Sequence, residues 1–162
     1  MSNQYIHVIF VGTLAATALS GCSGNGGPVF AALDAAKLAG PHTPTSCALD
    51  YVNGAGEPHA TFYASAPVGL QGWIIDANKR PPQKFFLALK GAKAYAIDGH
   101  AGAPRPDVAK AYGDPNALNS GFNLSADATA VPAGSYSAFL FIEGTDGAVQ
   151  VCETSWKIDV KA

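Results

Sequence analysis

The feature that most constrains the fold is a series of short apolar segments that begins at Cys47 and is broken by turn-forming residues. Asn53-Gly54 and Pro81-Pro82 are two of the breaks. Asn-Gly favours the positive φ angles of a tight hairpin turn, and proline interrupts a hydrogen-bonded ladder. Several short strands at regular spacing are typical of a sandwich or barrel. The sequence therefore predicts an all-β domain over residues 47–160.

The expected strands occupy eight runs, CALDYVNG, HATFYASA, GLQGWIID, KFFLALKG, AKAYAIDG, GFNLSAD, GSYSAFLFIEG and AVQVCETSWKIDV. Only 14% of the residues are charged, with 18 glycines and 11 prolines, which favours strands and turns over long surface helices. One short helical insertion is expected near residues 105–113. Pro106 suits a first helical turn, and Asp107 favours the positive end of a helix.

Charge and motif patterns exclude several functions. The net charge is −2 and no run of Lys or Arg occurs, so no nucleic-acid partner is expected. No Cys-x-x-Cys, paired His, Gly-x-Ser-x-Gly or phosphate-binding loop occurs, so we expect no metal, no cofactor and no catalytic residue. Asp98, Asp107 and Asp114 cluster around the helical insertion. They could supply a carboxylate pair or a calcium site, but aspartates beside Gly and Pro usually serve turns and caps.

The N-terminal region carries an apolar run, YIHVIFVGTLAATAL, ahead of the first charged side chain at Asp34. It is too short and too rich in small residues for a spanning helix, which needs about 20 apolar residues. The run fits the h-region of a signal peptide followed by a small-residue cleavage site. A buried N-terminal helix is the alternative.

Leu19-Ser20-Gly21-Cys22 closes this run and resembles the lipobox of bacterial lipoproteins. The resemblance implies that residues 1–21 are a signal peptide and that Cys22 carries a diacylglyceryl group as the mature N-terminus. It also implies a membrane partner reached through this lipid anchor. Ser23 follows the cysteine, which in that family favours the outer membrane, so the expected location is the cell envelope, facing the periplasm or the cell surface.

The segment between the lipobox and the predicted strands, residues 22–46, is rich in Gly and Pro. Such a composition predicts a flexible tether. A short helix fits AALDAAKLAG, where Gly40 and Pro41 would end it.

The cysteine count gives a further prediction. Three cysteines leave one unpaired in an exported protein, and lipidation of Cys22 would leave Cys47 and Cys152 as a pair. A bond between them closes a loop of about 100 residues, which the chain-entropy model values at about 4–5 kcal/mol. The periplasm permits such a bond. Two unpaired core thiols are the alternative.

The order of GWIID, LKGAKAYA, RPDVAKAYG, SGF and VPAGSYS resembles an immunoglobulin-like β-sandwich module of bacterial envelope proteins. The resemblance covers roughly residues 47–160 and implies an immunoglobulin-like antiparallel sandwich in a cell-surface setting. It supplies no catalytic residue.

Near the helical insertion, Tyr95, Arg105, Asp107 and Tyr112 form a candidate ligand rim, because aromatic rings can stack on sugars and charged groups fix orientation. The alternative is that Arg105 pairs with a neighbouring carboxylate and braces its loop. The sequence thus favours a non-catalytic lipoprotein module that binds a glycan or another envelope protein. A periplasmic hydrolase, or an inhibitor of one, is the second hypothesis.

Overall fold

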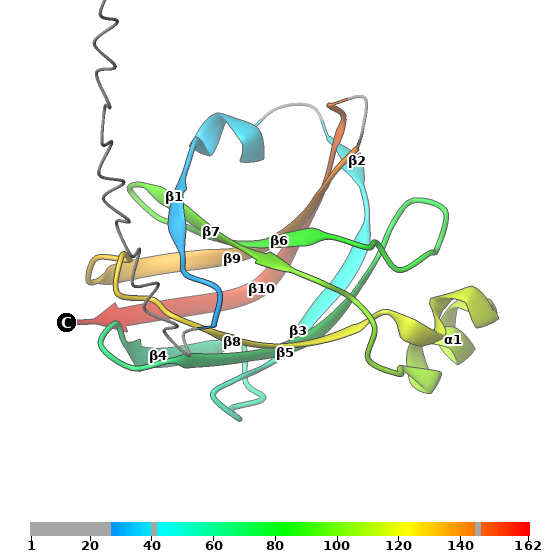
Figure 1. Cartoon of the computed structure of the whole chain (residues 1–162), viewed down its shortest axis with the longest axis horizontal. Helices are drawn as coiled ribbons and strands as arrows, with labels where there is room; N and C mark the ends of the chain where they lie inside the picture. The colour runs from blue at the N-terminus through cyan, green and yellow to red at the C-terminus, as the bar shows by residue number, and fades with distance from the viewer. Residues whose placement is uncertain (1–26, 40–41, 145–146) are drawn as a thin grey trace, which may run out of the picture.

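The computed structural model describes residues 27–39, 42–144 and 147–162. The lipobox and Cys22 lie outside the described residues. Two β-sheets pack face to face, with a short helical region at one end (Figure 1). The small sheet has the order β3 (Ser46–Val52), β5 (Val68–Ile75) and β8 (Gly121–Ala126). The large sheet has the order β1 (Ala31–Leu33), β7 (Ala94–Gly99), β6 (Phe85–Lys90), β9 (Gly134–Glu143), β10 (Val149–Lys161) and β2 (Thr43–Pro44), with β4 (His59–Tyr63) also paired to β10.

The main core lies between the two sheets because the strands alternate apolar and polar side chains. In β4 the pattern buries Ala60 and Phe62 and exposes the residues on either side. The large and small sheets meet at Phe85 and Phe122, whose ring centroids lie 4.8 Å apart. Phe86 points to the opposite face, where its ring stacks on Phe141 at 4.8 Å.

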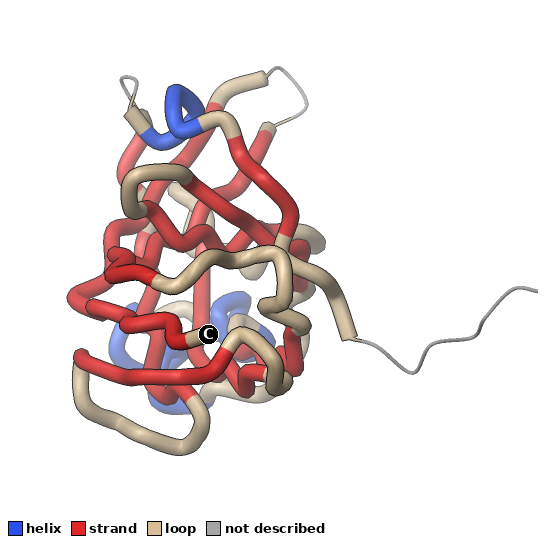
Figure 2. Tube along the Cα trace, turned by 90° about the vertical axis from the view of Figure 1, so that its left-hand side faces the viewer, coloured by secondary structure: helices blue, strands red, loops and turns tan. Residues whose placement is uncertain are grey.

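The outer face of the large sheet is also apolar, and an N-terminal segment covers part of it. The 3-10 helix η1 (Ala35–Leu38) places Leu38 in a cluster with Phe139 and Phe141. Figure 2 shows this helix and the helical region around α1 (Pro106–Tyr112) in different parts of the molecule. The large sheet is therefore buried over part of both its faces.

This covering segment corrects the expected tether over residues 22–46. β1 pairs antiparallel with β7, and Phe30 is 1% exposed inside the main core. From Gly27 to Ala39 the chain is thus part of the folded domain. The prediction from composition was wrong for these residues because a segment rich in small residues can pack against a sheet as well as form a linker.

The eight expected strands and the helical insertion are confirmed as β3 to β10 and α1. Pro106 stands in the first turn of α1, and Gly113 ends the helix with a left-handed φ of 62°. A second helical turn, η2 (Pro115–Asn119), follows directly, with Asp114 as its cap. Two pairings depart from the expected antiparallel arrangement, because β10 runs parallel to both β4 and β2.

A disulfide joins Cys47 in β3 to Cys152 in β10, with Cα atoms 6.1 Å apart. The pairing expected from the cysteine count is the one in the structure. It links the small sheet covalently to the large sheet.

Candidate functional site

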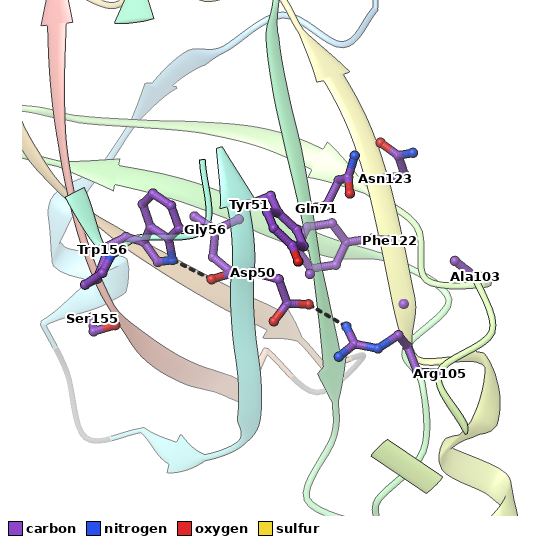
Figure 3. Close-up of a pocket in the computed structure, with 14 residues that line it drawn as sticks. Asp50, Tyr51, Gly56, Gln71, Ala103, Arg105, Phe122, Asn123, Ser155 and Trp156 are labelled. Carbon is purple, nitrogen blue, oxygen red and sulfur yellow. Dashed lines mark hydrogen bonds and ion pairs between the residues drawn. The ribbon is translucent and has the colours of Figure 1, made fainter. Parts of the chain in front are cut away.

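A cleft of about 700 Å³ opens beside the small sheet (Figure 3). Its floor comes from the middle of β3, β5 and β8, and one end is bounded by the loop that leads into α1. The other end meets β10 where its register with β9 shifts between Glu153 and Lys157. Residues far apart in sequence therefore converge on one concave surface, which is the usual form of a ligand site.

Three exposed polar side chains cross the floor of the cleft in a row. Tyr51 of β3 stands opposite Gln71 of β5, and Gln71 stands opposite Asn123 of β8. Directly opposed residues on one face of an antiparallel pair have Cβ atoms about 5 Å apart. Within the described residues, neither amide makes a hydrogen bond to the protein, so both present free donors and acceptors to the cleft. We call Tyr51, Gln71 and Asn123 the polar row.

Tyr51 supplies an aromatic surface at one end of the polar row. Tyr51 is 47% exposed and lines the cleft, so part of its ring is accessible to a ligand. A register shift in β3 between Leu49 and Tyr51 puts Asp50 outside the regular pairing. A bulge of this kind re-aims side chains, and here Asp50 reaches towards Arg105 (Figure 3).

Arg105 forms a charged fork at the end of the cleft next to α1. Its Nη1 donates to Asp50 Oδ2 at 2.6 Å. Its Nε and Nη2 donate to the two carboxylate oxygens of Asp107 at 2.9 and 2.7 Å. Paired N–H···O bonds to one carboxylate fix the plane of a guanidinium. Arg105 thus pairs with neighbouring carboxylates, as in the alternative to a role in the ligand rim.

The ion pair between Arg105 and Asp107 shifts the pKa values of both its members. The hydrogen bond from Arg105 lowers the pKa of Asp107 to about 2, against the opposing effect of desolvation. The hydrogen bond to Asp107 is the largest cause that raises the pKa of Arg105, and burial opposes it. Both carboxylates, Asp50 and Asp107, therefore stabilise the charged form of the Arg105 guanidinium.

Local sequence positions the arginine. The N–H of Arg105 donates to Leu118 O at 2.6 Å, which fixes the loop on η2. Val108 of α1 packs with Ile75 and Ala117 and anchors the helix to the small sheet. A Cβ atom on Gly121 would lie 2.9 Å from Arg105 Cγ, so only glycine lets the aliphatic part of the arginine cross β8 here.

The opposite end of the cleft is closed by β10. Trp156 is 3% exposed, and its indole Nε1–H donates to the carbonyl oxygen of Leu49 in β3. Because β3 pairs only with β5 among the named strands, this bond satisfies part of its open edge. Ser155 lies next to it and lines the cleft with a hydroxyl group.

The candidate rim predicted from sequence is only partly assembled. Arg105 and Asp107 are together, as described above. Tyr95 is buried in the main core, 6.3 Å from the ring of Tyr136, and borders a different cavity. The ring of Tyr112 packs edge-on against Trp73 at 5.8 Å. The prediction for both tyrosines, made from their proximity in sequence to the insertion, was therefore wrong. The side chain of Tyr95 in β7 points into the core, and Tyr112 of α1 packs against β5.

The polar row was missed at the level of sequence. Part of its signal was present, since Gln71 and Asn123 are each a polar residue between apolar or small neighbours in a short strand. The register that aligns the three strands side by side could not be read from one sequence. Asp50 was missed because a bulge, and not the strand period, determines its direction.

In the described parts of the chain, no group of three or more His, Cys, Asp and Glu side chains is arranged to hold a metal ion. Asp98 pairs with Lys84 at 2.8 Å, and Asp114 caps η2, so these aspartates serve separate structural contacts. No helix among the described residues has the length and apolarity needed to cross a membrane.

No family model, no curated protein and no solved structure matches this chain.

Proposed function

We propose that this protein is a lipid-anchored envelope lipoprotein whose β-sandwich is a non-catalytic module that binds a glycan in the cleft. The polar row is the observation that supports glycan binding. The lipobox at Leu19–Cys22 supports the lipid anchor, because acylation of Cys22 would hold the protein in the outer membrane. The Cys47–Cys152 disulfide is of the kind found in exported proteins, which supports an oxidising compartment.

The polar row suits a sugar chain for a chemical reason. A pyranose has an apolar face of C–H groups that can lie on an aromatic ring such as that of Tyr51, and an equatorial rim of hydroxyl groups. The free amides of Gln71 and Asn123 can each donate and accept hydrogen bonds to neighbouring hydroxyls. The row crosses three strands, so a linear oligosaccharide could place successive units along it.

The acid content of the cleft lining favours binding over hydrolysis. Glycoside hydrolysis generally needs two carboxyl groups facing each other across the scissile bond. Among the described residues that line the cleft, Asp50 is the only acid, and Arg105 holds it in an ion pair. A second acid in position to protonate a leaving group is not part of this lining.

The binding proposal is tested with the full chain in detergent micelles and a panel of tetrasaccharides. The panel contains β-1,4-linked N-acetylglucosamine, β-1,4-linked glucose, α-1,4-linked glucose and β-1,4-linked mannose. Isothermal titration calorimetry is expected to give a saturable, micromolar to millimolar affinity for at least one of them. Failure of all four to bind would overturn the glycan proposal.

A pair of tyrosines provides the matched control. Tyr51→Ala removes the ring of the polar row and is expected to weaken binding at least tenfold. Tyr63→Ala removes another exposed tyrosine, 62% accessible on β4 and not part of the cleft, and should leave the affinity unchanged. Equal losses in the two variants would contradict a site at the polar row.

The anchor is tested by intact mass of the protein extracted from cell membranes with detergent. A product that begins at Cys22 and carries acyl chains supports the proposal. Retention of Met1 and a mass without lipid would overturn it. Cys22→Ser, which removes the acceptor thiol, should leave the protein in the soluble fraction.

A further inference from the structure

An arginine in a polar cleft usually indicates an anionic ligand, but the environment of Arg105 points the other way. Its side chain is 21% exposed, and three of its N–H groups already donate to carboxylates. Among the described residues that line the cleft, it is the only cation. An anionic ligand would therefore find no positive charge that is not already compensated.

The charge of the cluster as a whole is negative. Two carboxylates, Asp50 and Asp107, surround one guanidinium and leave one net negative charge at neutral pH. Asp107 stays ionised well into the acid range because its pKa lies at about 2. The uncharged members of the polar row add hydrogen-bonding capacity without altering this sign.

We propose that the cleft selects uncharged glycans and rejects polyanionic ones such as oligouronates, because Asp107 and Asp50 neutralise its one arginine. This inference rests on the proposed glycan-binding function and assigns the class of glycan. Specificity of this kind comes from repulsion of the wrong ligand, not only from attraction of the right one.

Asp107 makes the inference testable without altering the lining of the cleft. It is 63% exposed on α1, it does not line the cleft, and its two carboxylate oxygens hold the outer side of the guanidinium. Asp107→Asn removes its charge with nearly the same shape. Arg105 and Asp50 would then form a pair with no net charge. The two Arg105 donors that bond Asp107 would lose their charged acceptor.

The experiment compares a tetrasaccharide that binds in the panel above with the same tetrasaccharide oxidised to carboxylates at C6. The unaltered protein should bind the neutral form about tenfold more tightly, the order of magnitude for a like-charge contact near a protein surface. In Asp107→Asn the difference should shrink at least threefold, through tighter binding of the oxidised form. Raising the salt concentration should shrink the difference in the unaltered protein as well, because salt screens the repulsion.

The outcomes separate this inference from the function on which it rests. Equal affinity of the unaltered protein for the two forms, or tighter binding of the oxidised form, overturns the charge selection but leaves glycan binding intact. An unchanged preference in Asp107→Asn overturns the role of the cluster. Absence of binding to every neutral tetrasaccharide overturns both. Asp98→Asn, which removes an exposed carboxylate paired with Lys84 outside the cleft, is the matched control and should keep the preference of the unaltered protein.

Discussion

Cys47 in β3 and Cys152 in β10 are bonded across the two sheets, 105 residues apart in sequence. The bond stands on the open side of β3, the strand that also provides Asp50 and Tyr51 to the cleft. Together with the Trp156 indole on Leu49, it holds the floor of the cleft against the large sheet. The edge of the small sheet is thus fixed covalently next to the residues we assign to binding.

Removal of this disulfide should be strongly destabilising. The double variant Cys47→Ala with Cys152→Ala is expected to lose about 4–5 kcal/mol in its free energy of unfolding, because a crosslink over about 100 residues restricts the unfolded chain. Urea unfolding monitored by tryptophan fluorescence measures the loss. A reducing agent should bring the unaltered protein to a similar midpoint and leave the double variant unaffected. If the urea midpoint of the unaltered protein did not change with the reducing agent, the result would contradict the pairing.

Replacement of Phe30 tests whether the segment after Gly27 belongs to the domain. Phe30 is 1% exposed in the main core, so Phe30→Ala should cost about 3–5 kcal/mol in the free energy of unfolding. Val29→Ala, at a residue 54% exposed, is the control and should change it by less than about 0.5 kcal/mol. Urea unfolding of the two variants and of the unaltered protein measures both changes in the free energy of unfolding. Similar stability of both would mean that the segment is a tether after all.

Gly72 in the middle of β5 should not tolerate a methyl group. A Cβ atom there would lie 2.1 Å from Ala48 O and 2.7 Å from Phe122 Cζ, so backbone and ring would both have to move. Gly72→Ala is expected to cost about 1–3 kcal/mol, as overpacking does elsewhere. At Gly102 a Cβ atom would meet nothing within 4 Å, and Gly102→Ala should be nearly neutral. Thermal unfolding of the two variants gives the comparison, and an equally small effect in both would refute the close approach of β3 to β5.

The ion pair of Asp107 should make stability depend on pH in the acid range. Its pKa is lowered from 3.8 to about 2 by the hydrogen bond from Arg105. A carboxyl group with a depressed pKa stabilises the folded state above its ordinary pKa, and this contribution is lost as the pH falls through the folded value. Stability should therefore decline between about pH 4 and pH 2.

The variants Asp107→Asn and Arg105→Met should each make this decline shallower, since either one removes the hydrogen bond that lowers the pKa of Asp107. A residual slope is expected, because hydrogen bonds from Thr129 and Ser135 also lower the pKa values of Asp127 and Asp159. Urea unfolding at a series of pH values from 5 to 2 provides the measurement. Parallel curves for the unaltered protein and Asp107→Asn would show that the pair does not stabilise the fold.

Much of the fold could be predicted from the sequence because its signals are local. Apolar segments and turn residues predicted strands over residues 47–160, which the structure places from Ser46 to Lys161, and Pro106 with Gly113 bounded α1. The odd cysteine count selected the pair that the structure joins. The parallel pairing of β10 with β4 could not be predicted, since it depends on a contact between residues 59–63 and the end of the chain.

The candidate site was harder to predict because it depends on register and on a bulge. Arg105 was singled out from its place before the helix, and its partner Asp107 from the same stretch. The third member, Asp50, stands 55 residues earlier and turns to the arginine only because β3 shifts its register there. Tyr51, Gln71 and Asn123 become a row only when three strands are aligned side by side.

The most direct test of the account is a two-dimensional ¹H–¹⁵N NMR titration of the full chain in micelles with the tetrasaccharide that binds. We predict that the shifts concentrate on the side-chain amides of Gln71 and Asn123 and on the backbone around Tyr51. Shifts confined to another surface, such as the cavity between Tyr95 and Tyr136, would contradict the assignment of the cleft as the binding site.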